Sequence, residues 1–161
     1  MIESDDGGVY KRLSPRLTTG SWVSLNGDLE VTEYHGIAYD GLADRVIGGT
    51  QDTGTSEQQQ IDSRVFISLH TGDGGDTVVD DNSSATLSSR YSSFQYLGSL
   101  RRRVYDASNV LQSQTFPART PINGSPALSA QFYTPLAVNR VNGLRLLLGA
   151  NNGLYESLDQ G

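Results

Sequence analysis

Residues 51–54, QDTG, recur as QYLG at residues 95–98, and residues 22–25, WVSL, recur as FISL at residues 66–69. Both pairs lie 44 positions apart (51 to 95 and 22 to 66). Two matches in one register are harder to attribute to chance than one. A period of roughly 40–50 residues built from short β runs is typical of repeated four-stranded sheets. The repeat therefore sets the expectation for the whole fold.

Looser copies support the same period. A short apolar run that ends in a carboxylate or amide occurs three times, as IAYD at 37–40, TVVD at 77–80 and LAVN at 136–139. Residues 148–151 resemble residues 47–51, and GLYES at 153–157 resembles GVYKR at 8–12. These runs are rich in β-branched and aromatic residues and are separated by Gly, Asn, Asp and Pro. The sequence predicts an all-β fold.

We expect part of a β-propeller, with about two complete four-stranded antiparallel blades and two partial blades. Propellers close with about four to eight blades, so about three units would be a fragment whose partners are the remaining blades. Residues 8–13 and 22–25 are expected to be the last two strands of the first, incomplete blade. The alternative is a complete small β-sandwich. The expected units are a partial blade at 8–25, blades at 34–69 and 76–116, and a partial blade at 134–161.

Composition excludes several functional classes. The chain has 18 glycines, 36% hydrophobic residues and a net charge of −6, which opposes a general nucleic-acid role. The one basic cluster, residues 101–103, is too short to change that expectation. No stretch reaches the roughly 18 apolar residues of a membrane span, and the acidic N-terminus does not resemble a signal peptide. There is no cysteine, so disulfides and thiolate metal sites are excluded.

One short motif occurs in a suggestive setting. Ser157, Asp159 and Gly161 fit the Asp-box pattern S-x-D-x-G, and Ser4, Asp6 and Gly8 fit it less fully. In such a turn the hydroxyl and carboxylate satisfy backbone N–H groups, and the glycine takes a positive φ. A glycine-aromatic strand precedes Ser157, which is where a propeller blade would place the motif.

With the segments DGGVY at 6–10, GGTQDTGT at 48–55 and GDGGD at 72–76, the chain resembles the BNR/Asp-box propellers. That group includes sialidases, xyloglucanase-type glycosidases and sortilin-type receptors. The likeness is greatest to bacterial, especially cyanobacterial, secreted or surface proteins. The resemblance covers nearly all of the chain and implies an extracellular or cell-surface location, with any signal outside this chain. Because one scaffold hosts hydrolases, lectins and receptors, it does not fix an activity.

The favoured function is a non-catalytic binding segment for a carbohydrate or protein ligand. The alternative is part of a glycoside hydrolase, in which Asp6 would be one of two carboxylates and the second would lie in missing blades. A sialidase needs separated arginines, whereas Arg101, Arg102 and Arg103 are consecutive and alternate between faces of a strand. Nothing specific favours a sortilin-type peptide-binding head.

Candidate ligand-binding residues come from the repeat. Gln51 and Asp52 follow a predicted strand, and Gln95 and Asn151 fall at equivalent positions. Amides repeated in this way suit sugar hydroxyls or water. They suit pairing with neighbouring backbone equally well, and that structural role is the favoured interpretation.

No cofactor is expected, although Asp73 and Asp76 in a glycine-rich turn are weak candidates for Ca²⁺. A turn with solvated carboxylates is the favoured interpretation of that segment. The two histidines, His35 and His70, are expected on the surface or in loops because neither has metal-ligand spacing. The repeat-equivalent aromatics at 22 and 66 are expected to pack between blades rather than to bind sugar.

Overall fold

The computed structural model describes residues 1–5, 7–28, 32–122 and 126–161. They divide into two compact units, residues 1–33 and 34–161, which are described separately. In the part of the chain that the structure describes, every element is a β-strand except one short 3-10 turn, η1 (Gln95–Leu97). The all-β prediction is confirmed, in the form of four small antiparallel sheets of three or four strands.

The first unit is one antiparallel sheet, here called the N-terminal sheet. It contains β1 (Ile2–Asp5), β2 (Gly8–Arg12) and β3 (Trp22–Ser24), in the order β1-β2-β3. The last two strands were predicted. The first was not, because its one apolar residue is followed by three polar ones and gives no apolar run. Asn26 ties the sheet together: its Oδ1 accepts from Val9 N (2.7 Å) and its Nδ2 donates to Gly7 O (2.8 Å).

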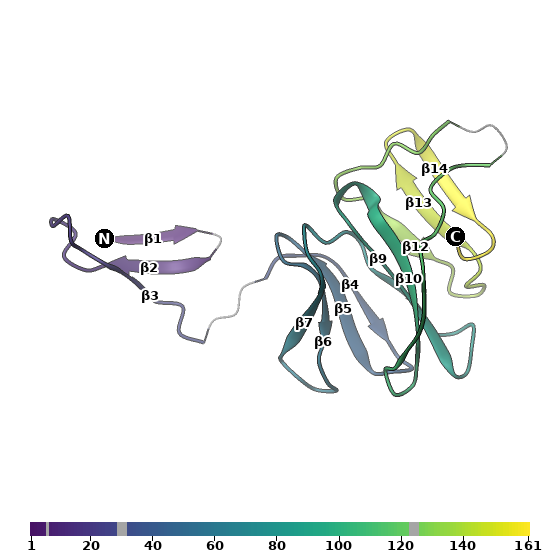
Figure 1. The fold of residues 1–161 in the computed structure, drawn as a ribbon, viewed down its shortest axis with the longest axis horizontal. Helices are drawn as coiled ribbons and strands as arrows, with labels where there is room; N and C mark the ends of the chain where they lie inside the picture. Colours follow the sequence, from purple (N-terminus) through teal and green to yellow (C-terminus); the bar gives the residue numbers. More distant parts are fainter. Residues whose placement is uncertain (6, 29–31, 123–125) are drawn as a thin grey trace. The chain divides into compact units, whose positions relative to one another are not determined.

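The second unit contains three sheets, each formed by strands in sequence order (Figure 1). Sheet I is β4 (Tyr34–Asp40), β5 (Arg45–Thr50), β6 (Gly54–Gln58) and β7 (Phe66–His70). Sheet II is β8 (Val78–Asp80), β9 (Leu87–Phe94), β10 (Gly98–Asp106) and β11 (Leu111–Thr115). Sheet III is β12 (Leu136–Val138), β13 (Leu146–Ala150) and β14 (Gly153–Ser157). All neighbouring strands are antiparallel.

The same turn, capped by an Asp or Asn side chain, follows the first strand of every sheet in this unit. Asp40 Oδ1 accepts from the N–H groups two and three residues on, at 3.0 and 3.1 Å. Asp80 Oδ1 makes the same two bonds, at 3.3 and 3.1 Å, and Asn139 Oδ1 makes them at 2.9 and 3.0 Å. Asx side chains favour such turns because they replace a backbone acceptor. The three sequence copies ending in Asp or Asn are therefore structurally equivalent.

The first strands of the three sheets are neighbours. β4 lies against β8, and β8 lies against β12. Thr77 Oγ1 donates to Gly36 O (3.4 Å), and Asp76 Oδ2 accepts from Leu136 N (3.0 Å), so the residues before β8 join it to both sides. Glycine permits the closest approach: a Cβ on Gly49 would lie 1.8 Å from Gly75 O. Larger residues would force sheets I and II apart here.

Alternation along β9 gives each face of sheet II a different neighbour. Arg90 points toward sheet I, where it meets Asp40 and Glu57. Tyr91 points the other way, into an apolar cluster with sheet III. The members of that cluster are Tyr91, Leu97, Leu100, Leu136, Leu146 and Leu148, and each is at most 8% exposed. The main apolar core of the unit thus lies between sheets II and III.

Candidate functional site

The sequence-predicted binding residues all lie in turns between the second and third strands of their sheets. Gln51 and Asp52 connect β5 to β6, Gln95 begins η1 between β9 and β10, and Asn151 connects β13 to β14. The equivalence expected from the repeat is therefore present in the structure. What differs is which of these residues lie together.

Asp73 forms hydrogen bonds with three of the four predicted binding residues. Its Oδ1 accepts from Gln51 Nε2 (2.9 Å) and from Asp52 N (2.9 Å). Its backbone N–H donates to Gln95 Oε1 (3.1 Å), and its carbonyl accepts from Gln95 N (2.8 Å). The segment between β7 and β8 thus joins the turns of sheets I and II. We call Gln51, Asp52, Asp73 and Gln95 the turn cluster.

His35 extends this cluster, contrary to its expected surface or loop position. It lies in β4 and is half-buried. Its Nδ1 lies 2.7 Å from Gly74 O and its Nε2 lies 3.0 Å from Gln51 Oε1. These polar contacts bridge residues 39 and 16 positions away, so they have no local signature in the sequence.

An exposed aromatic residue follows Gln95 of the turn cluster and meets a second exposed ring, and neither was singled out from the sequence. Tyr96 follows Gln95 directly, is 58% exposed, and has a left-handed backbone with φ of 57°. Its N–H donates to Phe132 O (2.9 Å), and the two rings meet edge to face at 5.4 Å. Phe132 is 43% exposed. Non-glycine residues seldom adopt this conformation, and such residues concentrate at functional sites.

Asn151 lies apart from these contacts. Its Nδ2 donates to Ala130 O (3.1 Å) and its N–H donates to Ser129 O (2.9 Å), both in the segment that precedes β12. Its amide thus pairs with neighbouring backbone, one of the two roles considered from the sequence.

The two calcium candidates are engaged by N–H donors. Asp73 has the contacts described above, and Asp76 accepts from Thr77 N (3.0 Å) and Leu136 N (3.0 Å). Burial and the nearby Asp76 carboxylate raise the pKa of Tyr133 to about 12. Among the described residues, no three His, Cys, Asp or Glu side chains are grouped so that they could hold a metal ion.

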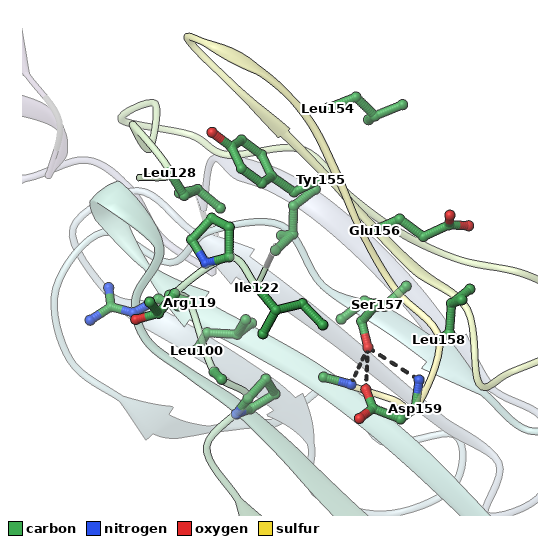
Figure 2. A pocket seen from close by; sticks show the side chains of 17 residues that line it. Leu100, Arg119, Ile122, Leu128, Leu154, Tyr155, Glu156, Ser157, Leu158 and Asp159 are labelled. Carbon is green, nitrogen blue, oxygen red and sulfur yellow. Dashed lines mark hydrogen bonds between the residues drawn. The ribbon is translucent and has the colours of Figure 1, made fainter. Parts of the chain in front are cut away.

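The Asp-box residues form a local turn at the end of β14 (Figure 2). Ser157 Oγ donates to Asp159 Oδ1 (2.7 Å) and accepts from Gly161 N (2.7 Å) and Asp159 N (3.3 Å). Gly161 has φ of 96°. The hydroxyl of Ser157 and the N–H of Gly161 lower the pKa of Asp159. The catalytic candidate Asp6 lies outside the described residues.

A cavity of about 550 Å³ adjoins this turn (Figure 2). Residues 117–122 form one wall, and sheet III with Leu100 forms the others. Leu100, Leu128, Leu146 and Leu148 give it a largely apolar lining, with Glu156 and Asp159 near its edge. Its chemistry suits apolar side chains better than a charged or polyhydroxylated ligand.

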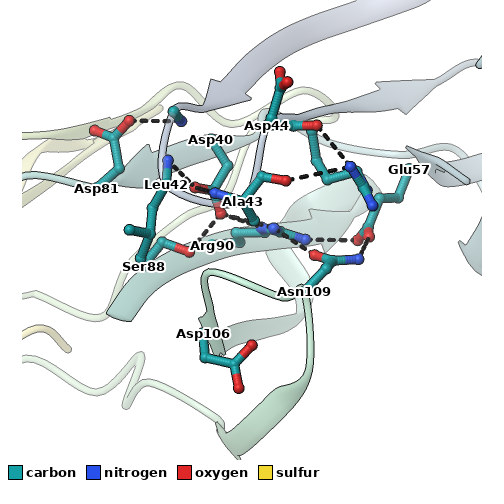
Figure 3. Close-up of polar contacts among 12 residues, drawn as sticks. Asp40, Leu42, Ala43, Asp44, Glu57, Asp81, Ser88, Arg90, Asp106 and Asn109 are labelled. Carbon is teal, nitrogen blue, oxygen red and sulfur yellow. Dashed lines mark hydrogen bonds and ion pairs between the residues drawn. The ribbon is translucent and has the colours of Figure 1, made fainter. Parts of the chain in front are cut away.

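A buried charged network joins sheets I and II, and no pattern in the sequence indicated it (Figure 3). Arg90 Nε and Nη2 both lie 2.7 Å from Asp40 Oδ2, and Arg90 Nη1 lies 3.0 Å from Glu57 Oε2 as an ion pair without hydrogen-bond alignment. Asn109 completes it, accepting from Arg90 Nη2 (2.7 Å) and donating to Glu57 Oε1 (2.8 Å). The guanidinium stacks over the Tyr105 ring at 4.0 Å.

Burial alone would raise the pKa of Asp40, but hydrogen bonds from Ser88 and from Ala43 N, with the charge of Arg90, hold it below its usual value. The side chains of Arg90 and Asp40 are 1% and 0% exposed. A group so enclosed has no room for a substrate. We interpret the network as the structural junction between two sheets.

Comparison with known proteins adds no identity. No family model matches the chain, and neither a curated protein nor a solved structure matches it. In the described parts of the chain, no helix has the length and apolar character needed to cross a membrane.

Proposed function

We propose that residues 34–161 are an arc of a β-propeller, with sheets I and II as complete blades and sheet III as a partial one. Three features support this proposal. The strands of each sheet follow in sequence order, the first strands are neighbours, and the second-to-third turns fall at repeat-equivalent positions. Blades that radiate from a central axis have this arrangement. The remaining blades of the parent protein are the implied partners.

The arc's function is non-catalytic binding, on a bacterial protein of the cell surface or exterior. The turn cluster with Tyr96 and Phe132 is the observation that carries this proposal. Gln95, which pairs with Asp73, is followed directly in the chain by Tyr96, whose backbone is strained and whose exposed ring meets that of Phe132. Polar groups that fix orientation beside apolar ring faces suit a carbohydrate ligand, and rigid aromatics bind with little entropy loss.

The Gln95 side chain can supply a hydrogen-bond donor at this site. Gln95 Oε1 is occupied by Asp73 N, which leaves the Gln95 amide NH₂ group for a ligand hydroxyl. Tyr96 lies next to that amide in the chain and is more than half exposed. A sugar ring on Tyr96 would thus accept from Gln95, which would couple stacking to a directional hydrogen bond.

Glycan-array binding of the full chain, followed by calorimetry on any hit, tests the proposal. Tyr96→Ala is expected to weaken binding at least about tenfold, equivalent to ~1.4 kcal/mol, whereas Tyr96→Phe should retain it. Tyr39→Ala is the matched control, because Tyr39 is 54% exposed in β4 and does not adjoin the turn cluster. Equal losses in Tyr96→Ala and Tyr39→Ala would contradict the site. Hydrolysis of a bound polysaccharide would favour the glycoside hydrolase alternative.

A further inference from the structure

Three consecutive arginines in β10 divide between the two faces of sheet II. Arg101 and Arg103 share the face that turns toward sheet I, because alternate residues of a strand lie on one face. Arg102 lies on the other face, where its Nε donates to Ser89 Oγ (3.2 Å). There, burial raises the pKa of Tyr91 to about 12, and the charge of Arg102 offsets part of that rise. The chain thus holds a pair of arginines and a matched third on the opposite side.

Arg101 is held in place by three neighbours. Its Nη1 lies 2.7 Å from His70 Nδ1, its Nε donates to Ser99 O (3.2 Å), and its guanidinium carbon lies 5.9 Å from the Phe116 ring centroid. Because an arginine can only donate, His70 Nδ1 must accept and carries no proton in this arrangement. His70 lies at the end of β7, so this contact joins sheets I and II through β7 and β10.

Arg103 is held by Gln114 of β11, whose Oε1 accepts from its Nε (2.7 Å). Within the described residues, no carboxylate oxygen lies within 4.0 Å of Arg101 or Arg103. Arg90, Arg140 and Arg145 have acidic partners, whereas Arg102, on the opposite face of β10, has none among the described residues and so matches Arg101 and Arg103 in this respect. Arg101 and Arg103 lie two residues apart on one face of β10, so their side chains are neighbours. Burial and the charge of Arg103 lower the pKa of Arg101.

We propose that Arg101 and Arg103 form a binding site for a tetrahedral oxyanion, namely a sulfate or phosphate group. The Nε atoms of both side chains are already used and Arg101 Nη1 donates to His70, so the remaining donors are the other N–H groups of the Nη atoms. Two guanidinium groups on one strand face offer several charge-assisted donors to an ion with three or four acceptor oxygens. A bound dianion would also neutralise two adjacent unpaired positive charges. This site is separate from the turn cluster and does not depend on the proposed sugar binding.

His70 provides a reporter inside the site. Burial, Arg101 and Arg103 lower its pKa from 6.5 to about 4. The groups that face it are Arg101 and Arg103 from β10 and Ser92 from β9, whose Oγ lies 3.4 Å from Nε2. A bound oxyanion offsets the two arginine charges, so it must raise the pKa of His70. By linkage, protonated His70 favours the anion in turn.

The test is NMR titration of the His70 ring proton in the full chain, with and without inorganic sulfate or phosphate. There are only two histidines, so His70→Gln assigns the signal. We expect saturable shifts and an increase in the His70 pKa with sulfate or phosphate. Sodium chloride and sodium acetate at equal ionic strength are expected to give neither. Equal responses to all four salts would overturn the proposal, as would no response to sulfate and phosphate.

Arginine variants locate the site. Arg103→Gln is expected to weaken sulfate binding roughly tenfold or more, since it removes a charged donor pair, and Arg102→Gln should leave it unchanged. Arg101→Lys keeps the charge but loses the planar guanidinium group, so its sulfate affinity should lie between those of Arg103→Gln and Arg102→Gln. Far-UV circular dichroism checks that each variant folds. If Arg102→Gln weakens binding as much as Arg103→Gln does, the effect is general charge attraction and the proposal fails. A sulfated oligosaccharide that competes with sulfate would identify a polymer-borne group rather than the free ion as the ligand.

Discussion

Sheets I and II meet through charges, whereas sheets II and III meet through leucines. We call these contacts the polar junction and the apolar junction. The polar junction contains Asp40, Glu57, Ser88, Arg90 and Asn109, and the apolar junction is the cluster around Tyr91 and Leu100. One strand, β9, supplies a member of each, because Arg90 and its neighbour Tyr91 point to opposite faces.

Two neighbouring contacts of similar burial thus depend on their residues in different ways. Hydrophobic burial has no direction, so it tolerates a change of shape when volume is preserved. A buried ion network requires every partner, because a charge without its partner is far more costly than the intact pair is favourable. The polar junction should therefore fail abruptly on substitution, and the apolar junction gradually.

Removing the central cation should have the largest effect. Arg90→Met leaves Asp40 and Glu57 buried without a counter-ion, and we expect a loss of about 3–5 kcal/mol in the free energy of unfolding. Urea unfolding of the full chain measures it. Arg90→Lys should recover little, because lysine lacks the planar fork that reaches Asp40, Glu57 and Asn109 at once.

Removing the opposing charges as well distinguishes charge from packing. The triple variant Arg90→Met, Asp40→Asn, Glu57→Gln should be more stable than Arg90→Met alone, because no buried charge remains. The introduced asparagine side chain would still offer an acceptor to the turn that Asp40 caps. If the triple variant is less stable than the single one, the junction depends on packing of the arginine stem and the comparison fails.

The apolar junction should respond by volume. Leu146 is 2% exposed in the cluster, so Leu146→Ala is expected to cost about 2–4 kcal/mol through lost burial and a cavity. Leu146→Met, which preserves volume, should cost less than about 1.5 kcal/mol. The quantity to compare between the two junctions is the ratio of the stability loss from a conservative substitution to that from a drastic one. A Met variant as damaging as the Ala variant would show that this junction is as shape-dependent as the polar one.

Local patterns made much of the fold predictable. Strand positions, the repeat and the turn signals depend on residues a few positions apart. The strands of sheets I, II and III span residues 34–70, 78–115 and 136–157, against expected units of 34–69, 76–116 and 134–161. The equivalence of the turns at Gln51 and Gln95 followed from one offset. Strand β1 escaped prediction because its four residues are all exposed and carry no apolar pattern.

The site was less predictable because its contacts are long-range. Arg90 lies among serines and tyrosine in the sequence and resembles a surface residue, yet its partner Asp40 is 50 positions away. His70 likewise gains Arg101 only when sheets I and II come together, and His35 gains Gly74 only when the segment between β7 and β8 packs against β4. Tyr96 became a candidate through its backbone angle, which no residue pattern encodes. The repeat located the turns, and only the packing of sheets shows which side chains share a surface.

The contact between sheets I and II should also depend on pH, through His70 beside the polar junction and Asp40 within it. Because the pKa of His70 falls from 6.5 to about 4 on folding, the unfolded chain binds more protons below pH 6.5. Stability should therefore decrease as pH falls from about 6.5 to about 4, and the contribution of His70 is then fully lost. Asp40, whose pKa is lowered from 3.8, adds a further loss at still lower pH. Urea midpoints measured across this range report both steps.

Variants separate the two groups. His70→Gln retains an acceptor for Arg101 but cannot titrate, so the slope between pH 6.5 and 4 should flatten while the loss at lower pH remains. Arg101→Gln should flatten this slope in part, because it removes one of the charges that lower the His70 pKa. Arg102→Gln, on the opposite face, should leave the slope unchanged. An unchanged slope in His70→Gln would mean that the contact between His70 and Arg101 opens before His70 titrates, and that the tight coupling between sheets I and II is confined to the polar junction.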